Sequence, residues 1–175
     1  MEAKILIKII NELRKKGWNI LEYKNPIGIQ FETQFTERYK TIPEDYLYFL
    51  SHIKSAINND EQSWFLCQNE YNDTKGDSFL WNQLEIISID TAKEEGDIEW
   101  VNEIKLFWDC HLPIMLSLKS GYSYIAIGTC ESNFGKIYYG VEPEFEEVTL
   151  IADSLVDFLN KLTNSYLEYP YNDFI

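Results

Sequence analysis

Apolar residues recur every three or four positions in several segments of the chain, which is the period of a helix that buries one face. Gly17 is placed to end the first of these segments. Thr41 is the candidate cap of the second, with Pro43 in its first turn, and Asp153 or Ser154 is the candidate cap of the last. The predicted helices are residues 2–16, a second that starts within Thr41–Asp45 and continues to Ile53, a third over 92–108, and a last with its apolar stripe from Leu155 to Leu162.

The second half of the chain also contains short runs rich in β-branched and aromatic residues, separated by turn signals every 10–12 positions. Such runs predict an antiparallel meander. They are Leu112–Leu118, Tyr122–Gly128, Lys136–Val141 and Glu147–Ile151.

The first half is less regular between its helices. Residues 25–28 predict a turn between two short extended pieces, 64–67 a short strand and 69–77 a polar loop. Residues 79–89 fit either a strand or a helix. The resulting expectation is one α+β domain over residues 1–175, with an antiparallel or mixed sheet flanked by N-terminal, central and C-terminal helices.

The cysteines and the N-terminus bear on location. Three cysteines without CxxC spacing predict neither a disulfide framework nor a zinc ribbon, and they suit a reducing compartment. Lys4 and Lys8 interrupt the N-terminal apolar cluster, so it does not resemble a signal peptide. The sequence contains no run of about 18 apolar residues, so we expect no membrane span. We therefore expect a cytoplasmic protein.

The charge is acidic and unevenly distributed. The net charge is −14, but residues 1–40 carry eight Lys and Arg against five Asp and Glu, whereas residues 41–175 carry seven against twenty-four. Such a field repels nucleic acid, which needs clustered cations, and attracts a basic protein. Acidity that serves only solubility is the simpler interpretation.

Candidates for catalysis are few. Cys110 and His111 are adjacent, and neighbours on an extended segment point to opposite faces, so they do not predict a nucleophile and base. Ser120–Ser123 lacks the glycines of a nucleophile elbow. Neither a phosphate-binding loop nor EF-hand spacing is present, and we expect no catalytic residue, metal or cofactor.

Two acidic segments each contain an aromatic residue, a combination typical of a binding anchor with a charged rim. A solvated surface is the alternative for each segment taken alone. The candidate partner-binding residues are Asp97, Glu99, Trp100 and Glu103 in the first segment, and Glu142, Glu144, Phe145, Glu146 and Glu147 in the second.

Residues 41–162 resemble the SUKH superfamily, which includes a yeast cell-wall-synthesis regulator and many bacterial immunity proteins. Ile42-Pro43-Glu44-Asp45-Tyr46-x-x-Phe49-Leu50 is similar to its LPxxYxxFL segment. The glycine turns and closing helix also resemble the family, although the Lys119–Tyr122 turn lacks the family's usual Asp. The residues to which the resemblance gives a structural role are Pro43, Tyr46, Phe49, Leu50, Gly121, Gly135, Ser154 and Phe158.

The resemblance implies a non-enzymatic, protein-binding domain. We expect an immunity protein that binds a basic toxin domain of the nuclease or deaminase type. A regulatory or scaffold domain that binds a host protein is the alternative, and an uncharacterised enzyme is a third. The aromatic tail at 166–175 is a candidate contact for a second copy, so a homodimer is one option for the assembly.

Overall fold

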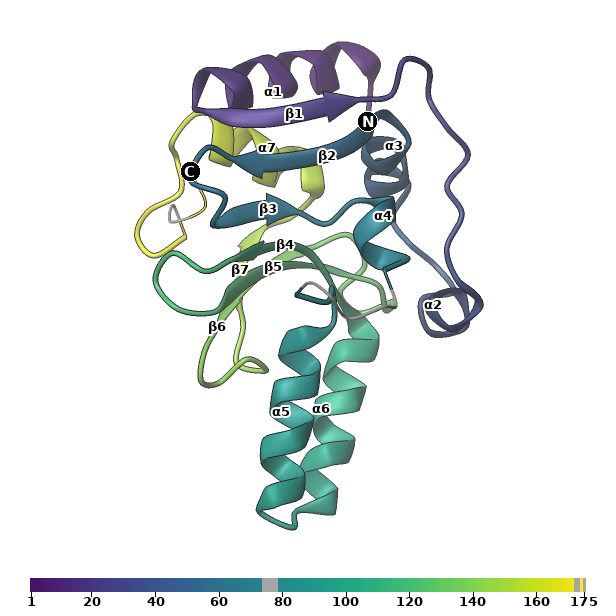
Figure 1. Cartoon of the computed structure of the whole chain (residues 1–175), viewed down its shortest axis with the longest axis vertical. Coiled ribbons are helices and arrows are strands. Elements are labelled where there is room, and N and C mark those ends of the chain that lie inside the picture. The colour runs from purple at the N-terminus through teal and green to yellow at the C-terminus, as the bar shows by residue number, and fades with distance from the viewer. Residues whose placement is uncertain (74–78, 172–173, 175) are drawn as a thin grey trace.

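The computed structural model describes residues 1–73, 79–171 and Phe174. Within these residues one seven-stranded antiparallel sheet runs in sequence order, each strand pairing with the next (Figure 1). The predicted meander is confirmed, and the sheet is antiparallel rather than mixed. Its strands are β1 (Trp18–Glu22), β2 (Ile53–Asn58), β3 (Ser63–Phe65), β4 (His111–Ser117), β5 (Ser123–Gly128), β6 (Ile137–Val141) and β7 (Thr149–Ala152).

Helices flank this sheet. α7 contacts both α1 and α3, whereas α5 and α6 pair as a hairpin that projects away from the sheet (Figure 1). The α+β fold with N-terminal, central and C-terminal helices is therefore confirmed. The helices are α1 (Ala3–Lys15), α2 (Thr33–Arg38), α3 (Glu44–His52), α4 (Gln68–Tyr71), α5 (Gln83–Glu94), α6 (Ile98–Cys110) and α7 (Leu155–Thr163).

Several local predictions were wrong in the first half of the chain. The second extended piece before α3 is the short helix α2, and β2 follows α3 directly, where only the end of a helix was expected. Pro43 itself occupies the N-cap position of α3, while Thr41 Oγ1 donates to Thr129 O at 3.4 Å. Tertiary contacts thus decide these short elements, whose sequences carry weak preferences.

The hairpin corrects a further prediction. Residues 92–108 are not one helix, because Gly96 adopts a φ of +73° and separates α5 from α6. The undecided segment 79–89 contributes the start of α5. The polar loop predicted at 69–77 begins instead inside α4, and its residues 74–77 lie outside the described residues.

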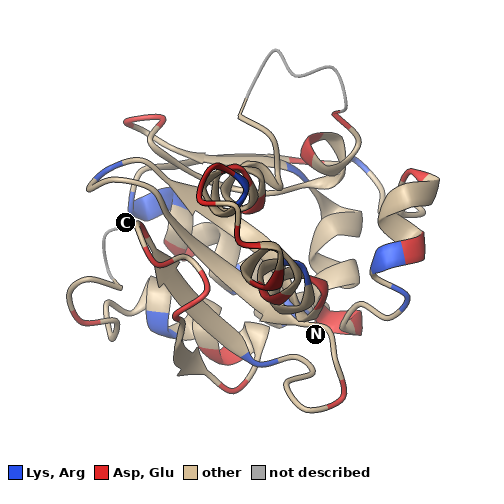
Figure 2. Cartoon of the chain, turned by 90° about the horizontal axis from the view of Figure 1, so that it is seen from below, with Lys and Arg blue, Asp and Glu red and all other residues tan. Residues whose placement is uncertain are grey.

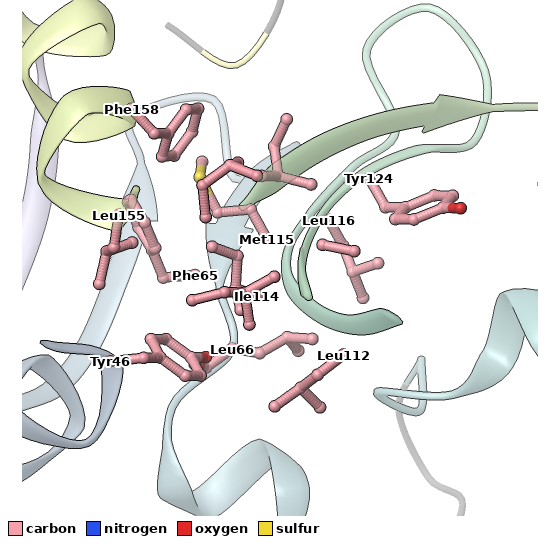
Figure 3. Close-up of a cluster of buried hydrophobic side chains, with 14 of the residues drawn as sticks. Tyr46, Phe65, Leu66, Leu112, Ile114, Met115, Leu116, Tyr124, Leu155 and Phe158 are labelled. Carbon is pink, nitrogen blue, oxygen red and sulfur yellow. The ribbon is translucent and has the colours of Figure 1, made fainter. Parts of the chain in front are cut away.

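The core is built around β4 and β5, which are buried on both faces. Leu155 and Phe158 of α7 lie on the side of Met115, whereas Leu116 and Tyr124 point to the other side (Figure 3). Because both sides are covered, these strands are continuously apolar rather than alternating. The sheet therefore needs a second covering layer opposite α7.

Tyr46 of α3 is fully buried and anchors that helix to the sheet. Its Oη lies 2.7 Å from Leu66 O and 2.6 Å from Tyr71 Oη, and Tyr71 Oη lies 2.6 Å from Pro113 O. The two adjacent hydroxyls thus donate to the carbonyl of Leu66, which follows β3, and to that of Pro113 in β4. Tyr46 therefore acts through this hydrogen-bond network as well as through packing.

The aromatic tail packs on its own chain. Phe174 and Leu167 are buried, and the rings of Tyr171 and Phe174 contact Tyr139. Tyr166 and Tyr169 are exposed. The homodimer contact proposed for this tail is thus reduced to two tyrosines, and its residues 172, 173 and 175 lie outside the described residues.

The cysteine prediction was wrong. Cys110 and Cys130 form a disulfide with a Cα–Cα distance of 5.0 Å, and only Cys67 among the three is free and buried. The pairing follows from the sheet, because His111 of β4 is the register partner of Gly128 of β5. Sheet register brings together two residues twenty positions apart, and sequence spacing alone does not reveal this.

Arg38 of α2 holds the base of the hairpin. Its Nη1 and Nη2 donate to the two carboxylate oxygens of Glu85 at 2.6 and 2.8 Å, and its Nε donates to Asp109 at 2.7 Å. Burial alone would lower the pKa of Arg38, but its hydrogen bonds to Glu85 and the nearby negative charges outweigh burial and raise it. One guanidinium of α2 thus binds α5 through a bidentate pair with Glu85 and α6 through a single bond to Asp109.

Replacing Arg38 should therefore destabilise the fold. Arg38→Met leaves the buried Glu85 carboxylate without its cation, so we expect a loss of about 3 kcal/mol in the free energy of unfolding, measured by urea titration at pH 7. Lys93→Met, which breaks the exposed Lys93–Asp90 pair, is the control and should cost less than about 1 kcal/mol. Equal effects of the two substitutions would contradict the role given to Arg38.

The disulfide predicts a thiol count. Protein denatured without reductant should show one reactive thiol, that of Cys67, and three after reduction. Cys67→Ser should show none before reduction. Because the bridge closes a loop of about twenty residues, its reduction should lower the free energy of unfolding by about 3 kcal/mol. Three thiols in protein purified under air would contradict the pairing.

Candidate acidic cleft

A cavity of about 460 Å³ lies between the α5–α6 hairpin and the loop that joins β6 to β7. We call it the acidic cleft. Its walls come from the two helices of the hairpin and from a loop more than forty positions further along the sequence, and among the described residues that line it none is Lys, Arg or His. The lining residues are Ile87, Ser88 and Thr91 of α5, Trp100 of α6, and Pro143, Glu144, Phe145, Glu146 and Glu147 of the loop.

The structure thus brings the two acidic segments together. Trp100 from the first segment and residues 144–147 from the second line the same cavity, although more than forty positions separate them. The sequence pattern indicated two separate surfaces. The hydrogen bonds and burial of each residue show how the cleft is formed.

Phe145 does not have the exposure expected of an anchor. Only 3 % of its surface is exposed, and it belongs to the hydrophobic core. The buried hydroxyl of Tyr124 on β5 donates to Phe145 O and holds the loop against the sheet. Phe145 therefore forms the floor of the cleft, and its predicted role as an exposed aromatic anchor is corrected.

Trp108 connects the hairpin to the same loop. Its buried indole packs on Tyr124 at 4.9 Å between ring centroids, and its Nε1–H donates to Glu146 Oε1 at 2.8 Å. The carboxylate of Glu146 satisfies a donor at the edge of the core. Glu146 thus positions the loop, while Glu144 and Glu147 remain exposed.

The other predicted residues lie outside the lining. Asp97 is the N-cap of α6, and its Oδ1 accepts from Trp100 N at 2.9 Å. Glu99 and Glu103 are exposed on α6. Glu142 lies against Gly121, which has a φ of +99° and no room for a Cβ beside that carboxylate.

The hairpin itself is strongly acidic. Residues 83–110 contain eight Asp and Glu against two Lys. Figure 2 looks at the hairpin end-on and shows acidic residues on both helices. Ile98 and Leu106 of α6 are 75 % and 68 % exposed, so apolar groups lie among these charges. The acidic cleft is therefore one part of a larger acidic surface that includes the hairpin.

Sequence reasoning missed the α5 wall. Ile87, Ser88 and Thr91 lie one and four positions apart, which places them on one face of a helix. That signal was present, but residues 79–89 fitted strand and helix equally.

The Cys110–His111 pair has a structural role. Cys110 is bonded to Cys130 and offers no thiolate. His111 stacks on Phe107 at 4.1 Å between centroids, and its Nδ1 lies 2.8 Å from Phe107 O. Its Nε2 lies 3.1 Å from Asn133 Nδ2 and accepts from that amide. Burial lowers the pKa of His111.

Neither a metal cluster nor a membrane span is found in the part of the chain that the structure describes. Within it, no three His, Cys, Asp or Glu side chains are grouped so that they could hold a metal ion. No helix in the same residues has the length and apolar character needed to cross a membrane.

Comparison with protein families identifies the fold. The model of the SMI1 / KNR4 family (SUKH-1) matches residues 30–161, which is most of the chain. The chain belongs to the SUKH-1 family. A comparison with curated proteins finds no match. The SUKH-1 match starts before α2 and includes the whole acidic cleft, while α1 and β1 lie outside it.

The residues that carried the SUKH resemblance occupy structural positions. Pro43, Tyr46, Phe49, Leu50 and Phe158 are buried. Ser154 is the N-cap of α7, since its Oγ accepts from Asp157 N at 3.2 Å. Gly121 and Gly135 have positive φ angles of +99° and +77°, which glycine adopts without strain. These residues build the SUKH-1 scaffold outside the cleft.

The environment of His111 predicts a pH effect. The lowered pKa means that the folded protein favours the neutral ring of His111. As the pH falls below about 6.5, the unfolded chain binds a proton at this histidine before the folded protein does, so the free energy of unfolding decreases. The ring proton of His111, assigned in NMR spectra with His111→Gln, should titrate below its usual range. His111→Gln should also flatten the fall in unfolding free energy between pH 7 and 5. A pKa above about 6.5 would contradict this environment.

Proposed function

We propose that this SUKH-1 protein is a non-enzymatic binding protein that neutralises a basic bacterial toxin domain, of the nuclease or deaminase type, at the acidic cleft. The single observation that carries the proposal is the meeting of two distant acidic segments around one cavity beside an exposed indole. The resemblance to bacterial immunity proteins supports a toxin as the partner.

The charge distribution supports a basic partner. Residues 41–175 have seventeen more acidic than basic residues, and the hairpin concentrates six of these excess charges in one projecting element. Such a field accelerates the encounter with a cationic surface. The exposed apolar residues Ile98 and Leu106 and the indole of Trp100 then supply contact area that slows dissociation.

The proposal places the protein in the cytoplasm, where a nuclease or deaminase toxin finds its substrate. The Cys110–Cys130 disulfide is more typical of oxidising compartments, so the cysteines no longer support this location. The proposed cytoplasmic location therefore depends only on where the proposed toxin would act.

Charge reversal tests the proposal. Glu144→Lys/Glu147→Lys should slow association with the product of the adjacent gene, which the proposal expects to be the toxin and which is used without its catalytic residues, about tenfold at low salt, and less at high salt. Association rates are measured by stopped-flow fluorescence or biosensor. Glu61→Lys/Glu168→Lys changes the net charge equally at exposed residues outside the cleft and should have a much smaller effect.

Two outcomes would overturn the proposal. Equal effects of the two double variants would mean that net charge, and not the cleft, governs binding. A second outcome is that binding stays unchanged when the charges of Glu144 and Glu147 are reversed together with those of Asp97, Glu99 and Glu103. These carboxylates would then be only a solvated surface. That result would favour the regulatory or scaffold role with a host partner.

A further inference from the structure

The acidic cleft has a composition that selects among cations. It combines apolar walls, an accessible indole and carboxylates, and none of its described lining residues is a cation. Its volume of about 460 Å³ falls within the range of about 300–1,000 Å³ found for sites that enclose small groups. This composition indicates which group of the partner enters the cleft, and the assignment of that group rests on the proposed function.

Two carboxylates of the cleft are available to a partner. Glu146 already accepts the hydrogen bond of Trp108, whereas Glu144 and Glu147 are exposed. No ion pair among the described residues involves Glu144 or Glu147. Glu147 N donates to Glu144 O at 3.1 Å, so one turn carries both side chains. Two uncompensated negative charges thus lie at the edge of one cavity.

Trp100 provides the second element. About 36 % of its surface is exposed, and it lines the cleft opposite the loop. The bond from its backbone N–H to Asp97 Oδ1 fixes the first turn of α6, and Val101 and Ile104 beside it are buried against the rest of the chain. The ring therefore has a supported backbone and does not depend on a loop.

We propose that the acidic cleft binds an arginine side chain of the basic partner. The guanidinium stacks on the Trp100 indole and pairs with Glu144 and Glu147, while its aliphatic stem lies along Ile87 and Pro143. Arginine fits better than lysine because its planar group stacks on aromatic rings, is weakly hydrated and pairs with carboxylates through several donors. Lysine keeps a compact, strongly hydrated charge.

Capped peptides of equal length test this choice with the full chain. One alternates glycine with arginine, the second with lysine and the third with citrulline, which is neutral and nearly isosteric with arginine. By calorimetry we expect the arginine peptide to bind about tenfold more tightly than the lysine peptide, and the citrulline peptide to bind least. Free arginine should bind far more weakly than the arginine peptide, because the partner's other charges also contribute.

Substitutions assign the preference to the cleft. Trp100→Ala should remove the difference between the arginine and lysine peptides and leave salt-dependent binding of both, whereas Trp100→Phe should retain part of it. Glu144→Gln/Glu147→Gln should weaken both peptides. Asn102→Ala, at an exposed position of the same helix outside the cleft, is the control and should change neither, with circular dichroism checking that every variant folds.

The results separate this inference from the proposed function. Equal affinities for the arginine and lysine peptides, both lost in Glu144→Lys/Glu147→Lys, would overturn the arginine site and leave the acidic binding surface intact. An arginine preference that survives Trp100→Ala would also overturn it. Free arginine binding as tightly as the peptide would make the cleft a small-molecule site, which contradicts an arginine supplied by a protein. If no basic peptide binds, the arginine site is wrong.

Discussion

The burial of β4 and β5 on both faces is the constraint on which the rest of the molecule depends. Two strands that are apolar throughout need a covering layer on each side, and α7 provides only one of them. On the other side Tyr124 packs on Trp108 of α6 and holds the backbone at Phe145. The base of the hairpin and the β6–β7 loop therefore lie side by side because both cover the same strand.

The acidic cleft is a by-product of this packing. Phe145 turns inward and Glu146 is tied to Trp108, so the side chains of Glu144 and Glu147 are left outside. Arg38 fixes the same base of the hairpin through Glu85 and Asp109. Both walls of the cleft are thus held in place by buried or half-buried groups of the chain itself. Under the proposed function, this would lower the entropy lost when the partner binds.

Local patterns predicted the elements that depend on local physics. The four-residue repeat of α1, the Ser154 cap and the β-branched runs of β4–β7 were recognisable because neighbours in sequence determine them. The pairing of Cys110 with Cys130, the position of Phe145 and the meeting of Trp100 with Glu144 depend on sheet register and on the hairpin's direction. Those are contacts between residues distant in sequence, and the periodicity of apolar residues does not predict them. The acidic residues were therefore found individually, but the cavity they share was not.

The position of the hairpin between two paired strands determines which mutations the fold can tolerate. β3 and β4 are direct antiparallel neighbours, yet the chain between Phe65 and His111 makes a long excursion before it returns to pair. The closure entropy of such an excursion grows only slowly with its length. Mutation can therefore lengthen, shorten or recharge the hairpin at small thermodynamic cost while the meander beneath it stays constant. Under the proposed function, a scaffold with that property would let related proteins diverge in the partner they bind while they keep the same fold.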